Sequence, residues 1–126
     1  MRRILIVAGD PSGDLVASQL VTALKRISSD IEIASVGGRE LERVSDRFLG
    51  NIVEQGAFGL PVSPRHLQFF RGVLNGTIIP EIEKNKPDAV IPVDFYGFNS
   101  RVARAAKERG SKVFYYASPQ FWASRP

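Results

Sequence analysis

The amino-acid sequence predicts an α/β domain, a Rossmann-like parallel sheet with helices on both faces. Short apolar runs alternate along the chain with stretches of helical periodicity, which is typical of βαβ units. The first run, residues 4–8, is continuously apolar and ends at Gly9, the pattern of a strand buried on both faces. Right-handed crossovers then place every strand-to-helix loop at one edge of the sheet.

The first half of the chain predicts three strands and two helices. Strands are expected at residues 4–8, 31–36 and 48–53. Asp14 can cap a helix whose apolar positions share one side, namely Leu15, Leu20, Leu24 and Ile27. A short helix is expected at residues 39–46, after Gly37 and Gly38.

The second half begins with a loop at residues 55–64, which is rich in glycine and proline. Residues 65–84 have helical spacing, but Pro80 lacks the amide hydrogen that a helix interior needs, so a kink or break is expected near residues 78–79. A strand at 89–93, a helix at 99–109 and a strand at 112–117 follow. Pro92 fits an internal strand only at its end or beside a gap in the ladder.

Composition limits the possible functions. The 126 residues form one domain, with 44% hydrophobic and 24% charged residues. The chain has no cysteine and one histidine, His66, which excludes disulfides, thiolate chemistry and a multi-histidine metal site within it. The formal charge of +4 favours anionic partners. No apolar run has the length of a signal-peptide core or a membrane span, so a cytoplasmic location is expected.

The stretch AGDPSGD, residues 8–14, lies where many nucleotide enzymes bind phosphate. It lacks the lysine of the Walker pattern and the three glycines of the dinucleotide pattern. It is either a tight turn whose Asp14 caps the helix, or a ligand loop in which Ser12, Gly13 and the helix N-terminus hold hydroxyls or phosphate. Because two aspartates would repel a phosphate, a sugar with several hydroxyls suits it better.

Asp94 follows an apolar strand, so its carboxylate is expected at the carboxyl end of that strand, where α/β folds place their sites. It could act as a general base toward a hydroxyl, or it could brace the loop.

Asn99 could cap the following helix or contact a ligand. Gln120 beside Trp122 could form a sugar platform or cover the core.

Other aromatic side chains are expected in the core. Tyr115 and Tyr116 belong to the core and the sheet face in this interpretation. Four apolar residues around the kinked helix are core by default, but they could form a surface for acyl chains or membrane: Phe58, Leu60, Phe69 and Phe70. The neighbouring basic residues Arg65, His66 and Arg71 would suit anionic headgroups.

Taken together, seven short segments resemble the lipid-A-disaccharide synthase family, in the family's order. They are AGDPSGD (8–14), VGG (36–38), GAFG (56–59), KPD (86–88), VD (93–94), FN (98–99) and SPQFWA (118–123). The resemblance implies a glycosyltransferase of the GT-B type, built from two Rossmann-type domains that face a cleft. Residues 1–126 would be the single N-terminal, acceptor-side domain, without the C-terminal donor-binding domain.

The resemblance also implies a reaction: an inverting transfer of acylated glucosamine from a UDP-sugar to an acylated glucosamine 1-phosphate. Asp94 matches the aspartate that activates the acceptor hydroxyl, and Ser12, Gly13, Asp14, Asn99, Gln120 and Trp122 would bind the acceptor. The sequence departs from the family at three positions, where it has Asp10, Gly97 and Ser124. We expect no metal, no cofactor and no nucleic-acid partner, and little activity without a donor domain.

The expected partners are the acceptor, the UDP-sugar once a second domain is present, and the inner membrane surface as a peripheral contact. A homo-oligomer or a split-enzyme partner stays open. Two alternatives remain: a non-catalytic module that binds acylated sugars or a partner protein, and an unrelated nucleotide-binding α/β domain.

Overall fold

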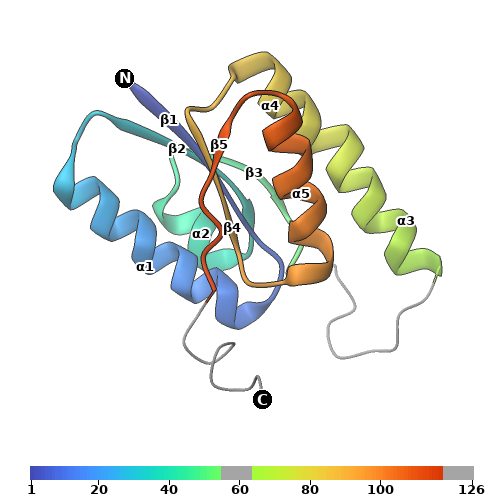
Figure 1. Cartoon of the computed structure of the whole chain (residues 1–126). Helices are drawn as coiled ribbons and strands as arrows, with labels where there is room; N and C mark the ends of the chain where they lie inside the picture. The colour runs from blue at the N-terminus through green and yellow to red at the C-terminus, as the bar shows by residue number, and fades with distance from the viewer. Residues whose placement is uncertain (55–63, 118–126) are drawn as a thin grey trace.

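A five-stranded parallel sheet forms the centre of the computed structural model, which describes residues 1–54 and 64–117 (Figure 1). The strands are β1 (Arg2–Ala8), β2 (Ile31–Gly37), β3 (Arg47–Asn51), β4 (Ala89–Val93) and β5 (Lys112–Val113). Their order is β3-β2-β1-β4-β5, and every pair is parallel. The predicted α/β class is confirmed.

Helices cover both faces of this sheet (Figure 1). They are α1 (Pro11–Ile27), α2 (Arg39–Val44), α3 (Pro64–Val73), the π-helical segment η1 (Leu74–Ile78), α4 (Ile79–Asn85) and α5 (Tyr96–Glu108). Successive β1 side chains point to opposite faces, so the strand serves two cores. Ile6 and Ala8 pack in the core that includes α1 and α2, and Leu5 and Val7 pack in the core that includes α4 and α5.

The buried side of α1 differs from the predicted one. Leu15 is 48% exposed and Ile27 is 81% exposed, although both were expected on the apolar side. Small residues face the sheet instead, with Ala17 and Val21 fully buried. Small side chains let the helix backbone approach the sheet closely, so the prediction from apolar spacing was wrong at both ends of the helix.

The long helix changes its hydrogen-bond pattern where the sequence predicts a kink or break, but the chain stays helical through residues 64–85. The π-helical segment η1 ends at Ile78, and α4 begins with Ile79 and Pro80 in its first turn. Proline has no amide hydrogen to donate, and the π-type hydrogen bond from the Ile79 amide to the Leu74 carbonyl comes directly before it. The wider π turn lets one continuous helical segment pass the proline ring.

Pro92 explains why β5 is shorter than the sequence predicts. Phe114 and Tyr116 donate their amides to the carbonyls of Val90 and Pro92, so these even-numbered positions of β4 face β5. Pro92 has no amide hydrogen, so it cannot donate a ladder hydrogen bond to the β5 side. The ladder stops at Val113, and a single bridge between Val93 and Tyr116 follows. The proline therefore lies beside a gap in the ladder, as one of its two predicted settings required.

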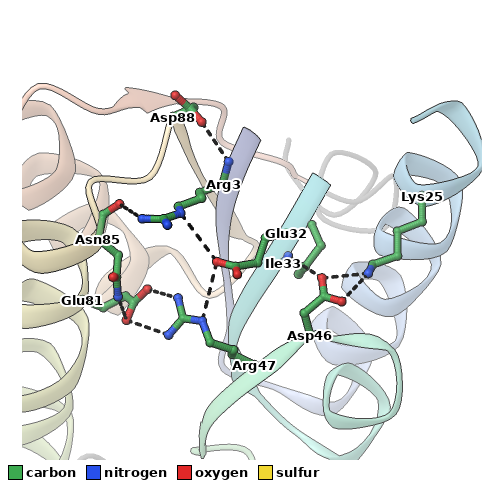
Figure 2. A network of polar contacts seen from close by, with 9 residues as sticks. All are labelled: Arg3, Lys25, Glu32, Ile33, Asp46, Arg47, Glu81, Asn85 and Asp88. Carbon is green, nitrogen blue, oxygen red and sulfur yellow. Dashed lines mark hydrogen bonds and ion pairs between the residues drawn. The ribbon is translucent and has the colours of Figure 1, made fainter. Parts of the chain in front are cut away.

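Charged side chains connect the strands at the amino edge of the sheet (Figure 2). Arg47 of β3 donates to both carboxylate oxygens of Glu81 on α4, and Arg3 and Arg47 both pair with Glu32 of β2. Burial raises the pKa of the Glu81 carboxyl. Hydrogen bonds from Arg47 and Asn85 lower this pKa by more than burial raises it, so the net pKa lies below its ordinary value. The charged form of Glu81 thus stabilises the fold.

A second carboxylate, Asp46, joins α1 to the same edge (Figure 2). It accepts two hydrogen bonds from Lys25 and one from the Ile33 amide. Burial raises the pKa of the Asp46 carboxyl, and these donors lower it by more, to a net value below the ordinary one. The amino edge therefore has two sets of ion pairs, one around Arg47 and Glu32 and one between Lys25 and Asp46.

Glu81→Gln should lower the free energy of unfolding at pH 7 by about 1–2 kcal/mol, between the values typical of exposed and buried ion pairs. The Glu81 pKa is lower in the folded protein than in the unfolded chain. Its stabilisation is thus complete above the ordinary value of about 4.3 and is lost as the pH falls through the folded value. Urea denaturation at several pH values should show the variant and the wild type converging in acid.

Glu83→Gln is the matched control for this prediction. Glu83 lies on the same helix and pairs with Arg109, but its side chain is 57% exposed against 10% for Glu81. Its loss should cost less than about 0.5 kcal/mol. Equal denaturation midpoints for Glu81→Gln and the wild type at pH 7 would contradict the role given to Glu81.

Candidate functional site

The candidate site lies at the carboxyl edge of β1 and β4, the neighbouring strands in the middle of the sheet order. The chain leaves β1 toward α1 on one face and leaves β4 toward α5 on the other (Figure 1). Such a topological switch point is where open α/β sheets bind their ligands. The two loops that meet there contain Gly9 and Asp10 on one side, and Asp94 and Phe95 on the other.

Asp10, and not Asp14, caps α1. The Oδ1 atom of Asp10 accepts a hydrogen bond of 2.6 Å from the Gly13 amide and one of 3.3 Å from the Ser12 hydroxyl. Pro11 occupies the first turn, where its missing amide hydrogen costs nothing. The negative charge at the helix N-terminus is therefore supplied by the chain itself. Ser12 is exposed and Gly13 is buried, so of these two predicted ligands the hydroxyl is the accessible group.

Asp14 braces the neighbouring loop. Its side chain is 4% exposed, and it accepts hydrogen bonds from the amides of Gly38 (2.8 Å), Glu40 (2.9 Å) and Leu41 (3.1 Å). These amides form the first turn of α2, which has Gly38 at its N-cap position and no capping side chain of its own. Asp14 therefore caps α2 from another helix, and its predicted role as cap of α1 was wrong.

Close approach to Asp14 explains the glycine pair before α2. A Cβ atom added to Gly38 would lie 2.6 Å from the Oδ2 atom of Asp14. One added to Gly37 would lie 3.2 Å from Oδ1 and 2.5 Å from the Leu41 side chain. A side chain at Gly38 would therefore collide with the carboxylate to which the Gly38 amide bonds.

Asp94 sits in a strained turn at the end of β4. Asp94 and Phe95 have φ values of 47° and 48°, so two consecutive residues with side chains adopt the left-handed conformation. Such a residue costs on the order of 1–3 kcal/mol and persists only where its surroundings hold it. Asp94 is 7% exposed, and its amide donates to the Tyr116 carbonyl at 2.9 Å.

Asn99 lies inside α5 and does not cap it, because the helix begins three residues before the predicted start. The side chain is fully buried. Its Nδ2 atom lies 3.1 Å from each of three backbone carbonyl oxygens, those of Val7, Val93 and Asp94. Asn99 therefore links the ends of β1 and β4 to the Asp94 turn.

Tyr115 is the site residue that sequence reasoning missed. It was expected in the core or sheet face, but it is 37% exposed and its hydroxyl donates to the Asp94 carbonyl at 2.6 Å. Burial raises the pKa of Tyr115 to about 12, and the Asp94 carboxylate adds to the increase, so the hydroxyl stays a donor through neutral pH. The gap in the ladder opposite Pro92 was the signal that could have found it. Tyr116, also expected in the core, is 39% exposed.

Aromatic rings support the turn from behind. Phe95 packs against Phe70 and Phe98 at centroid distances of 5.4 and 6.1 Å, and Phe69 packs edge-on against Phe70. Phe69 and Phe70 belong to the edge of the core and do not form a free apolar surface. The default expectation of a core position holds for Phe69 and Phe70, and Phe58 and Leu60 lie outside the described residues.

Gln120 and Trp122 also lie outside the described residues, so their predicted contact with the acceptor stays a prediction. Within residues 1–54 and 64–117, no three acidic or histidine side chains gather as a metal site. In that part of the chain, no helix has the length and apolar character needed to cross a membrane.

Fold and site together define a Rossmann-like α/β domain with a carboxylate held at the switch point of its sheet. The chain belongs to the lipid-A-disaccharide synthetase family, whose model matches residues 4–126. A lipid-A-disaccharide synthase of Coxiella burnetii is 34% identical over 124 residues, covering 98% of this chain and 33% of the relative. Lipid-A-disaccharide synthase 1 of Legionella pneumophila is 38% identical over 122 residues, covering 96% of this chain and 32% of the relative. A lipid-A-disaccharide synthase of Myxococcus xanthus is 38% identical over 127 residues, covering 98% of this chain and 32% of the relative.

This chain spans about a third of the length of these curated relatives. Among solved structures, the C-terminal domain of a hydrogenase from Pyrococcus furiosus superposes with a TM-score of 0.65. It is 19% identical and covers 91% of both chains, a likeness of fold alone.

Gly9→Ala should lower the free energy of unfolding by about 1–3 kcal/mol, the usual cost of overpacking. An added Cβ would lie 2.1 Å from the Phe95 ring, so the ring and the turn that carries it must shift. Gly72→Ala in α3 is the control, because nothing lies within 4 Å of its added Cβ and alanine favours a helix by up to about 1 kcal/mol. Thermal unfolding of both variants tests this, and a Gly9→Ala as stable as the wild type would contradict the close packing of Phe95 on the loop.

Proposed function

We propose that this chain is the acceptor-side domain of a lipid-A-disaccharide synthase-type glycosyltransferase. Membership of the family supports the reaction class, and the buried Asp94 at the carboxyl end of β4 is the observation that carries the proposal. The completed enzyme transfers acylated glucosamine from a UDP-sugar to an acylated glucosamine 1-phosphate. A donor-binding domain, in the same parent chain or in a second subunit, holds the UDP-sugar and completes a GT-B arrangement.

Asp94 is the general base in this proposal. Its carboxylate takes the proton of the attacking acceptor hydroxyl as the oxygen forms a bond to the anomeric carbon and the bond to UDP breaks on the opposite face. This displacement inverts the anomeric centre. The turn that carries Asp94 has its backbone bonded on both sides, so the carboxylate is held in place before substrate binds.

The first loop suits sugar hydroxyls better than phosphate. Asp10 already accepts from the Gly13 amide and places a carboxylate at the N-terminus of α1. The exposed Ser12 hydroxyl can exchange its 3.3 Å contact with Asp10 for a sugar hydroxyl. We therefore propose Ser12 as a direct acceptor contact. Gly13 and Asp14 shape the acceptor site behind Ser12, and Asn99 supports the backbone of the site. Gln120 and Trp122 stay proposed acceptor contacts.

Asp94→Asn should reduce turnover of the completed enzyme by about 100-fold or more, the usual loss when a general base is removed. The substitution keeps the fold, because Asn99 and Tyr115 bond to the main-chain carbonyl of residue 94 and not to its side chain. Glycosyl transfer to acylated glucosamine 1-phosphate measures the effect. This chain alone should bind the acceptor weakly and show no appreciable transfer, because the donor is not held.

Asp88→Asn is the matched control, since Asp88 precedes the same strand at the opposite edge of the sheet, where it accepts from the Arg3 amide. It should leave turnover unchanged. Near-normal turnover in Asp94→Asn would reduce Asp94 to a bracing residue. Saturable binding of acceptor with no transfer by the completed enzyme would favour a non-catalytic module, and preference for nicotinamide nucleotides would favour an unrelated domain.

We also propose that α3 contacts the inner membrane surface, where an acylated acceptor resides. No residue of α3 is buried, Leu67 is 55% exposed, and Arg65 and Arg71 are exposed on the same helix. An exposed leucine beside basic side chains suits acyl chains and anionic headgroups. Because Phe69 and Phe70 pack on the core, Leu67 replaces them as the residue to test.

Leu67→Ser should weaken co-sedimentation with anionic vesicles by about 5-fold or more, because one exposed leucine no longer enters the acyl boundary. Leu15→Ser in α1 is the control, since Leu15 is 48% exposed on the helix layer at the other face of the sheet. If Leu67→Ser and Leu15→Ser co-sediment with anionic vesicles equally, α3 is excluded as the membrane contact.

A further inference from the structure

The Asp94 turn is held by side chains that come from two other parts of the chain. Tyr115 follows β5, and Asn99 lies in α5. Both donate to the same atom, the carbonyl oxygen of Asp94, at 2.6 Å and 3.1 Å. The two hydrogen bonds fill both lone pairs of that oxygen, and the Asp94 amide is bonded to the Tyr116 carbonyl.

We propose that Tyr115 and Asn99 are positioning residues, which keep Asp94 and Phe95 in their left-handed conformations and so aim the Asp94 carboxylate at the acceptor hydroxyl. This inference rests on the proposed function of Asp94 as general base. Hydrogen bonds fix both peptide groups of Asp94, so the backbone holds the point from which the carboxylate projects.

The setting of Asn99 fits a donor role and no other. The Oδ1 atom is buried and has no hydrogen-bond partner among the described residues, while Nδ2 faces three carbonyls. Turning the amide over would place Oδ1 against three oxygens. An unpaired buried carbonyl is unfavourable, so the amide is kept for its donor end. A leucine of similar size, or an aspartate, would leave those carbonyls without a donor.

The setting of Tyr115 separates positioning from stability. The ring is 37% exposed, so it contributes little to the core, and the hydroxyl makes its described contact with Asp94 alone. Phe114 and Tyr115 lie outside β5 because Pro92 interrupts the ladder there. The interruption frees this short segment from sheet geometry, and the Tyr115 hydroxyl reaches the turn.

Tyr115→Phe removes one hydroxyl and tests the proposal in the completed enzyme. We expect kcat to fall by about 10- to 100-fold with KM changed by less than about two-fold, because a misaimed base slows the chemical step without loosening the acceptor. Tyr96→Phe is the control. Tyr96 is 61% exposed beside the same turn, and its hydroxyl has no hydrogen bond among the described residues. Its kcat should match the wild type.

The double variant shows whether Tyr115 acts through Asp94. In an Asp94→Asn background, Tyr115→Phe should change the remaining rate by less than about two-fold, because a base that is absent cannot be misaimed. A merely structural tyrosine would lower the rate by the same factor in both backgrounds, and that result would overturn the proposal.

A readout on the 126-residue chain does not depend on activity. A positive φ brings the amide and Hα hydrogens of one residue close together, so Asp94 and Phe95 should give intense intraresidue NOEs that weaken in Tyr115→Phe. Unchanged NOEs with unchanged kcat would overturn the positioning role while leaving Asp94 as the base. Near-normal turnover in Asp94→Asn would instead overturn the proposed function, and this inference with it.

Discussion

The side-chain amide of Asn99 joins three pieces of backbone on which the candidate site is built. Its Nδ2 atom lies within hydrogen-bond distance of carbonyls at the end of β1, at the end of β4 and in the turn that follows β4. Parallel strands of an open sheet have unpaired groups where their ladder ends, and buried groups of this kind need partners. One buried amide supplies the donor for all three, so the two loops of the switch point keep a fixed relation.

Asp14 performs the complementary task on the neighbouring loop. Where Asn99 offers a donor to carbonyls, Asp14 offers acceptors to the amides of Gly38, Glu40 and Leu41. A carboxylate that accepts several backbone amides is well stabilised when buried, and it ties α1 to the start of α2. The carboxyl edge of the sheet is thus organised by two short polar side chains that contact main chain rather than each other.

The two edges of the sheet are built from different interactions. The amino edge has mutually paired charges, in which Arg47, Glu81, Lys25 and Asp46 connect strands to helices. The carboxyl edge holds the left-handed residues Asp94 and Phe95, a strained arrangement typical of functional sites. In the first turn of α5, nothing lies within 4 Å of a Cβ added to Gly97.

The sequence by itself determined the alternation of strands and helices and the position of Asp94 at a strand end. It also predicted an irregularity in the long helix before Pro80 and limited Pro92 to a strand end or a gap in the ladder. These features depend on local periodicity and on the missing amide of proline, which act wherever the chain folds. Family resemblance added the reaction class, because short motifs in a fixed order need no coordinates to be recognised.

Only the tertiary structure decided what the polar side chains contact. Asp14 bonds to amides 24 to 27 positions away, and Asn99 bonds to a carbonyl 92 positions away, distances over which no local pattern operates. Local rules offered each residue as a cap of the nearest helix or as a ligand contact, but the cap positions belong to Asp10 and Phe95. Tyr115 became a site residue because the sheet brought the end of β5 beside the Asp94 turn. Buried hydrogen bonds are settled by which donors and acceptors the packed chain leaves unpaired.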